Sequence, residues 1–217
     1  MPTRDEMTTR DPMWPAIHAE RAALAADLER LGDAQWAHRS LCGAWTVEQV
    51  VAHLTAGAST GRVRWLASII GARFDAGLHN QRRLAEHLGA TPAETLDRFR
   101  RILTRTTAPS GHTAAWLGEI VVHGQDIRHP LGLPHTPPVE TVEPVARFYA
   151  SRNFTVAGRT MIEGLRLAAT DSTFTAGTGA QVRGTTLALT MAMAGRAAYC
   201  DDLTGAGVPT LRKRCGG

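Results

Sequence analysis

The chain has 217 residues, of which 43% are hydrophobic and 6% are aromatic, and its formal net charge is +4. This length and hydrophobic content predict a folded protein with one sizeable domain, alone or with a small second one, and exclude a largely disordered chain. The positive charge is mild, the arginines are scattered and the aromatic residues form no stacking pattern, so we expect no nucleic-acid-binding surface.

The sequence also predicts a cytoplasmic protein. It contains no run of about 18 apolar residues, so no membrane span is expected. The charged N-terminal stretch lacks the apolar core of a signal peptide. Three widely spaced cysteines do not indicate a disulfide framework or a thiolate zinc site.

The first part of the chain is predicted to be helical. Apolar residues recur at helical spacing in five segments, 16–32, 47–70, 80–88, 92–106 and 113–127. Thr46 and Thr91 precede two of these segments as N-cap residues, and Pro92 suits a first helical position. The pattern indicates an antiparallel helical bundle, and the proline-rich segment 129–138 is predicted to be a linker.

The residue pattern, and with it the predicted secondary structure, changes after the linker. Residues 142–155 are predicted to form a short helix, and 164–185 show the alternation and glycine turns of two or three short strands. Residues 186–203 return to a helical pattern, and 207–217 are expected to be a basic tail. We therefore expect a mainly α protein with a helical bundle at 1–137 and a small α+β C-terminal domain at 138–217.

The pair Glu119 and His123 is the strongest candidate for chemistry. Residues four apart on a helix share one face, so this pair can present a carboxylate and an imidazole to one point, as in metal sites built inside helical bundles. His53, flanked by Val50, Val51 and Leu54, is the best third ligand. Two histidines and a glutamate with one open position are typical of catalytic zinc, although iron and nickel also accept these ligands.

Simpler interpretations stay open at this point. Glu119 and His123 can form a solvated or locally bonded pair, and His53 can be a core histidine with its hydrogen bonds satisfied. Asp126 and Arg128 are expected to form a salt bridge at the helix end, and His129 is expected in a loop. Asp126 is also a candidate hydrogen-bond partner of a ligand histidine.

The other motifs give weaker evidence for a catalytic or binding site. No serine lies in a G-x-S-x-G turn, and "GTGAQVRG" lacks the pattern of a phosphate-binding loop. Cys42 precedes the His53 helix, but no neighbouring residue in the sequence marks it as a reactive thiolate.

The motifs "GAWTVEQVVAHLT" and "GEIVVHGQDIRHPLGLP", with the C-terminal segments, resemble the mycothiol-dependent maleylpyruvate isomerase family, whose fold is a DinB-like four-helix bundle followed by a small C-terminal domain. The resemblance covers nearly the whole chain. It implies that His53, Glu119 and His123 bind zinc or another divalent metal. It also implies a catalytic arginine, with Arg196 the preferred counterpart and Arg183, Arg212 and Arg214 as alternatives. From the segment "FDAGLHN", Asn80 and with it Arg83 are expected to line the substrate pocket.

The implied activity is mycothiol-dependent isomerisation or S-transfer on an electrophilic small molecule. In such an isomerase, the thiolate of mycothiol adds to a conjugated double bond, allows rotation and leaves again, while an arginine holds the negative charge. The alternative is a non-catalytic binding or regulatory module that keeps the bundle. The expected partners are mycothiol and a small-molecule substrate, with neither nucleic acid nor membrane, and the chain is expected to be a monomer or a homodimer.

Overall fold

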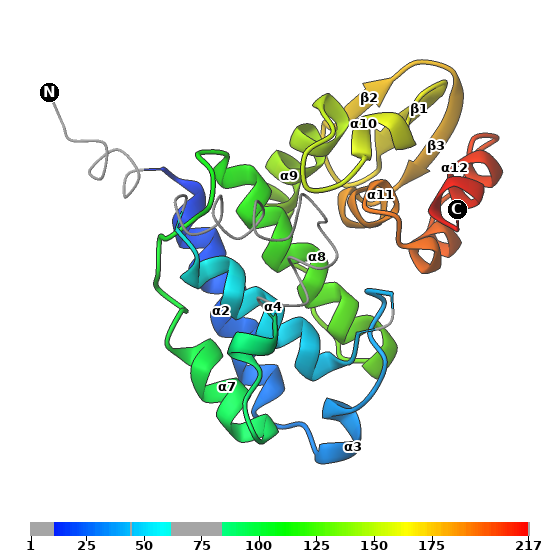
Figure 1. Ribbon diagram of the computed structural model, residues 1–217. Coiled ribbons are helices and arrows are strands. Elements are labelled where there is room, and N and C mark those ends of the chain that lie inside the picture. The colour runs from blue at the N-terminus through cyan, green and yellow to red at the C-terminus, as the bar shows by residue number, and fades with distance from the viewer. Residues whose placement is uncertain (1–10, 44, 62–83, 217) are drawn as a thin grey trace, which may run out of the picture. The chain divides into compact units, whose positions relative to one another are not determined.

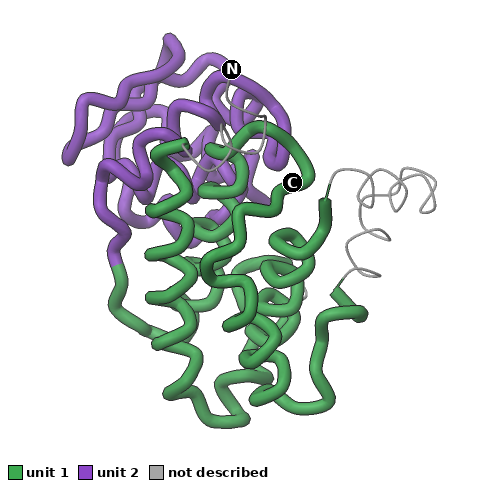
Figure 2. Tube along the Cα trace, turned by 90° about the vertical axis from the view of Figure 1, so that its left-hand side faces the viewer, with its two compact units in different colours: residues 1–135 green, residues 136–217 purple. Residues whose placement is uncertain are grey.

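The computed structural model describes residues 11–43, 45–61 and 84–216. The chain divides into two compact units, residues 1–135 and residues 136–217 (Figure 2). Each unit contains its own buried apolar residues, so each is described by itself.

Within its described residues, the first unit contains a bundle formed by the helices α2 (Met13–Leu28), α4 (Val47–Ser59), α7 (Pro92–Arg100) and α8 (Thr113–Leu131). Helix α2 packs against α8, α8 against α4, α4 against α7, and α7 against α2, so the four close into a ring around one core (Figure 1). A short helix, α3 (Asp33–Trp36), and a helical turn at 84–87 complete the described part of this unit. The predicted helical bundle is confirmed.

The predicted helix starts at Thr46 and Thr91 are confirmed. The Thr46 hydroxyl accepts a hydrogen bond from the Gln49 backbone N–H, and the Gln49 side chain accepts a bond from the Thr46 N–H. The Thr91 hydroxyl accepts a hydrogen bond from the Glu94 backbone N–H, and Pro92 is the first residue of α7. Helix α4 ends at Ser59, because Thr60 has an extended backbone (φ −104°, ψ 108°). Residues 62–70 of the predicted helix lie outside the described residues.

Helix α8 is longer than predicted. It continues through His129 and Pro130 to Leu131, where Gly132 ends it with a left-handed backbone (φ 63°). The expectation that His129 lies in a loop was therefore wrong. Pro130 has no N–H to donate to the carbonyl of Asp126 four residues earlier, and the backbone N–H of Leu41 donates to that carbonyl instead, at 3.0 Å. None of the described helices, α8 included, has both the length and the apolar character needed to cross a membrane.

The second unit is the small α+β domain that the sequence predicted. Strand β1 (Leu165–Ala169) lies in the middle of a three-stranded sheet of order β2-β1-β3, antiparallel to β2 (Thr175–Gly177) and parallel to β3 (Ala180–Gly184). Helix α11 (Thr186–Met193) packs against β1, β3 and α9 (Val139–Ser151), and α9 also contacts β2. The short helix α10 (Gly158–Met161) packs against α9.

Two predicted features of this unit were wrong. The segment 186–203 is not one helix: α11 ends at Met193, Gly195 takes a positive φ of 86°, and a 3₁₀ helix, η1, spans Ala197–Asp202. The C-terminal segment is not a tail, because Val208–Cys215 form helix α12, which starts with Pro209 in its first turn and buries Leu211. The run of basic residues suggested a solvated tail, because Leu211 is the one buried residue of this helix.

We expect Gly179→Ala to destabilise the second unit. Gly179 joins β2 to β3 with a φ of 127°, and an added Cβ would lie 2.1 Å from the carbonyl oxygen of Gly164. The backbone strain alone costs about 1–2 kcal/mol, and the clash adds to it. Gly195→Ala is the matched control, because Gly195 also has a positive φ but no atom within 4 Å of the place that an added Cβ would take. Equal losses of stability in chemical denaturation would contradict the steric explanation.

Candidate metal centre

Helices α4 and α8 bring the three predicted ligands together in the first unit. His53 lies in α4, and Glu119 and His123 lie one turn apart in α8. Each offers one ligand atom, and these three atoms all lie within 4.8 Å of one another. A spacing of this size allows one cation to contact all three.

The geometry centres on one oxygen of the glutamate. The distance from His53 Nε2 to Glu119 Oε2 is 3.3 Å, and that from His123 Nε2 to the same oxygen is 3.4 Å. The two imidazole rings meet edge to face with their centroids 5.0 Å apart. The side chains are mostly buried, with Glu119 the most exposed at 24%. The cluster is therefore shielded but open on the side of its carboxylate.

The charges of the cluster support each other. Burial by itself would raise the pKa of the Glu119 carboxyl, but hydrogen bonds from His123 and His53 hold the pKa well below its usual range. Burial lowers the pKa of the His123 imidazole, and hydrogen bonds with Asp126 and Cys42 raise it. Glu119 raises it further, and the pKa lies well above its usual value. The cluster therefore keeps an ionised carboxylate beside the positive charge of His123, and a bound cation would take the place of a proton on the His123 imidazole.

Asp126 orients the His123 ring through the nitrogen that does not face Glu119. Its carboxylate accepts a hydrogen bond from His123 Nδ1 at 2.9 Å, and its side chain is fully buried. This bond leaves Nε2 of His123 directed at Glu119. Carboxylates commonly fix metal-binding histidines in this way.

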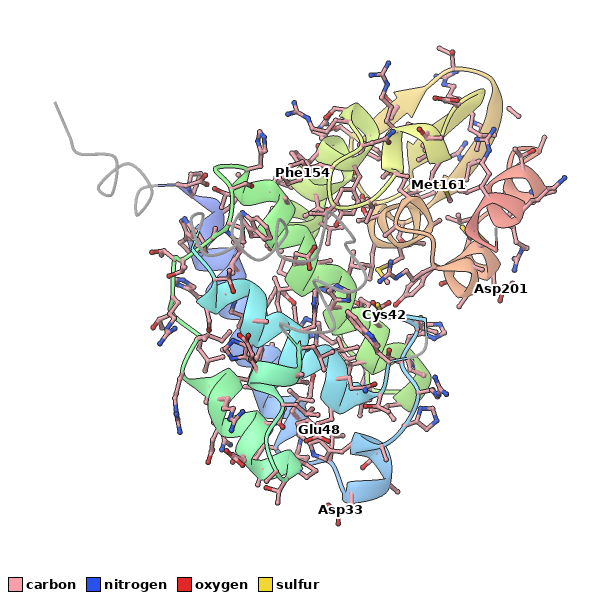
Figure 3. All side chains as sticks on the ribbon, viewed as in Figure 1. Asp33, Cys42, Glu48, Phe154, Met161 and Asp201 are labelled. Carbon is pink, nitrogen blue, oxygen red and sulfur yellow. The ribbon has the colours of Figure 1, made fainter. Side chains whose placement is uncertain are left out.

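The connector between α3 and α4 adds two residues to the cluster. Trp45 places its indole against His53, with ring centroids 5.0 Å apart. Cys42, labelled in Figure 3, lies with His123 and Asp126 in a second group whose ligand atoms are within 4.8 Å of one another. The Leu41 bond to α8 positions this connector. Sequence reasoning found no role for Cys42, because its partners are distant in the chain and only the fold brings them close.

Asp126 and Arg128 do not form the predicted salt bridge. Asp126 pairs with His123, whereas Arg128 points to α2, where its Nε donates to Asp27 Oδ2 at 2.7 Å. Arg128 Nη1 also lies 4.0 Å from Glu20 Oε2, which His135 contacts at 2.9 Å through Nε2. Helix α8 thus directs Asp126 to the cluster and Arg128 to the interface with α2.

A pocket adjoins the cluster within the first unit. His53 and Glu119 line it, together with Arg21 from α2. The remaining wall is largely apolar and contains Leu54, Gly57, Ala58, Thr107, Trp116 and Ile120. Two of the three candidate ligands therefore line this pocket.

The other predicted site residues fall elsewhere. Asn80 and Arg83 lie outside the described residues. Arg196 lies in the second unit between α11 and η1, where it is half-buried and its Nη1 donates to the Ala194 carbonyl at 2.5 Å. Of the alternative arginines, Arg212 pairs with Asp201 at 2.7 Å, Arg214 donates to the Met161 carbonyl at 2.8 Å, and Arg183 is exposed on β3.

The donor set fits a catalytic divalent metal. Two imidazoles and one carboxylate match a three-ligand site with a fourth position for water or substrate. The same ligands suit zinc, iron or nickel. The oriented His123 and the adjoining pocket are further features of such sites.

Comparison with known proteins gave one family match and two similar solved structures. Residues 17–110 match the family model described as the mycothiol maleylpyruvate isomerase N-terminal domain. The chain is similar in structure to a crystal structure of the mycothiol-dependent maleylpyruvate isomerase, with a TM-score of 0.61 at 15% sequence identity, over 95% of this chain and 96% of that one. A histidine-to-alanine mutant of that enzyme gives a TM-score of 0.62 at the same identity and coverage. A comparison with curated proteins gave no match.

Proposed function

Residues 17–110 match the mycothiol maleylpyruvate isomerase N-terminal domain family, and from this premise we propose that the protein is a metal-dependent enzyme that uses mycothiol. Its reaction is the isomerisation of an electrophilic small molecule or the transfer of the thiol to it. The observation that carries the proposal is the cluster of His53, Glu119 and His123, whose ligand atoms converge beside a pocket.

These three residues are proposed to hold zinc or another divalent cation. When bound there, the cation would lower the pKa of a coordinated thiol and so supply a nucleophile near neutral pH. Glu119 would contribute the negative charge of the site, since its carboxyl stays ionised in this environment. Asp126 would keep the His123 ring in its binding orientation through the Nδ1 bond.

Further residues are proposed from the family resemblance. Arg196 is proposed as the catalytic arginine that pairs with the negative charge of the reacting substrate. Asn80 and Arg83 are proposed to contribute to substrate binding. The apolar wall around Trp116 supports a small carbon skeleton as the substrate rather than a polymer.

The test combines metal analysis with a thiol-dependent assay. We expect the purified protein to contain about one equivalent of zinc or another divalent metal per chain. Maleylpyruvate and a panel of conjugated electrophiles are then incubated with the protein, with mycothiol, with glutathione and with no thiol. Turnover or adduct formation that requires both the metal and mycothiol is expected.

A metal-loaded protein that produces neither isomer nor adduct with any electrophile would contradict the enzyme proposal and favour the non-catalytic binding module. The product distinguishes the two reactions: a geometric isomer with mycothiol recovered indicates isomerisation, and a stable conjugate indicates S-transfer. Arg196→Gln is expected to lower turnover without lowering the metal content.

A further inference from the structure

Arg21 is a buried cation that no protein carboxylate neutralises within the described chain. The residue lies in α2, is 6% exposed, and lines the same pocket as His53 and Glu119. Other buried charges of this unit are paired, as Arg128 is with Asp27. A buried charge without a partner costs free energy, so its retention at a pocket wall points to a ligand that supplies the opposite charge.

The hydrogen bonds of Arg21 leave one edge of the guanidinium available. Nη1 donates to the carbonyl oxygens of Ile102 at 3.0 Å and Arg105 at 2.8 Å, which accounts for both of its hydrogens. Nε and Nη2 have no partner among the described residues. Neither atom is among the fully buried polar atoms that lack a hydrogen-bond partner, so both retain some exposure to solvent. The Nε–Nη2 edge is one with which arginine binds a carboxylate through two parallel hydrogen bonds.

The two backbone bonds also fix the direction of the side chain. Ile102 and Arg105 follow the end of α7, so Arg21 is held at a point where α2 meets the segment after α7. Burial lowers the pKa of the guanidinium to about 10, which still leaves it protonated near neutral pH. A ligand in the pocket therefore meets a preformed positive charge at one wall and the candidate metal centre at another.

We propose that Arg21 is a specificity-determining residue that binds a carboxylate group of the substrate and thereby discriminates acidic from neutral electrophiles. The inference rests on the proposed function, since it assigns a role in substrate recognition to a residue of the same pocket. It gives the acid two recognition points, the Nε–Nη2 edge of Arg21 for one carboxylate and the apolar wall at Leu54, Trp116 and Ile120 for the carbon chain. Arg21 is on this view a specificity-determining residue, separate from the arginine of the second unit.

The experiment compares the binding of maleate, a dianion, with that of its neutral dimethyl ester. Both are titrated against the full-length protein, in metal-loaded and chelator-treated form, by calorimetry and by the fluorescence of Trp116 assigned with Trp116→Phe. We expect maleate to bind more tightly than the ester in both forms. Arg21→Gln is expected to weaken maleate binding on the order of 10- to 100-fold and to leave ester binding and zinc content unchanged.

Two further variants sharpen the comparison. Arg21→Lys keeps the charge without the paired donors and is expected to give intermediate affinity. Arg30→Gln removes the same charge from a side chain that is 74% exposed, and is expected to leave maleate binding unchanged. Maleate affinity equal in Arg21→Gln and wild type would overturn the inference. If the Arg21 variants do not fold, the wild-type titrations decide, because equal binding of maleate and its ester also overturns it.

The outcome is separable from that of the proposed function. Maleate binding is measured without mycothiol and without turnover, so an Arg21-dependent preference can be observed even where the enzyme proposal fails. Conversely, mycothiol-dependent turnover with equal efficiency on acids and esters would support the proposed function and refute the role of Arg21.

Discussion

Replacement of His123 by alanine is expected to lower the affinity of the protein for zinc by more than about 100-fold, beyond the 10- to 100-fold typical for loss of a residue that orients a ligand. The reason is that His123 is one of the three residues of the candidate site and, with His53, one of the two histidines whose Nε2 approaches Glu119 Oε2. A two-ligand site made of His53 and Glu119 retains neither the coordination number nor the enclosure of the original. The measurement is a zinc titration in competition with a chromophoric chelator. Wild-type affinity is expected to fall as the pH is lowered, because protons compete for both imidazoles.

Two matched variants separate coordination from general disturbance. Asp126→Asn leaves all three ligands in place and alters the bond to His123 Nδ1, so its zinc affinity is expected to drop by about 10- to 100-fold. His38→Ala removes an exposed histidine of the connector whose Nδ1 contacts the neighbouring Arg39 carbonyl, and its affinity is expected to stay unchanged. Full zinc affinity in a folded His123→Ala variant would show that the cluster is not the metal centre.

The cluster could be predicted from the sequence because the prediction used only the spacing and the nearest neighbours of its residues. The four-residue spacing of Glu119 and His123 determines their common face on a helix, and the apolar neighbours of His53 determine that its helix buries that side. The caps at Thr46 and Thr91 are also local, since a side chain and a backbone N–H three residues later form them. The bundle and the mixed second unit followed from these periodicities.

Features that depend on distant partners could not be predicted. Arg21 and Arg128 look like ordinary solvated arginines in the sequence, and only the packing of α2 reveals one as a pocket residue and the other as a buried ion-pair partner. Cys42 joins the cluster through the Leu41 bond to α8, which exists because Pro130 leaves a carbonyl unsatisfied. The hydrophobic periodicity does not show which distant group bonds to this carbonyl, although Pro130 itself indicates that one helical hydrogen bond is missing.

The second large effect is expected for Arg128→Met, which should reduce the free energy of unfolding of the first unit by about 3–5 kcal/mol. Arg128 is 1% exposed, and its removal leaves the Asp27 carboxylate without its buried partner at the interface of α2 and α8. Glu20 loses a weaker attraction at 4.0 Å but keeps its contact with His135. The loss is measured by urea denaturation followed by tryptophan fluorescence.

Asp27 provides an internal control, because a second arginine contacts its other oxygen. Arg30 Nη2 lies 2.7 Å from Asp27 Oδ1, the same distance as that between Arg128 Nε and Oδ2, but Arg30 is 74% exposed. Arg30→Met is therefore expected to cost less than about 1 kcal/mol, since water screens an exposed pair. Equal costs for the two arginines would contradict the assignment of the difference to burial. Adding Asp27→Asn to Arg128→Met is expected to restore part of the lost stability, because part of the penalty arises from the Asp27 carboxylate, which keeps Arg30 at Oδ1 but has lost its buried partner at Oδ2.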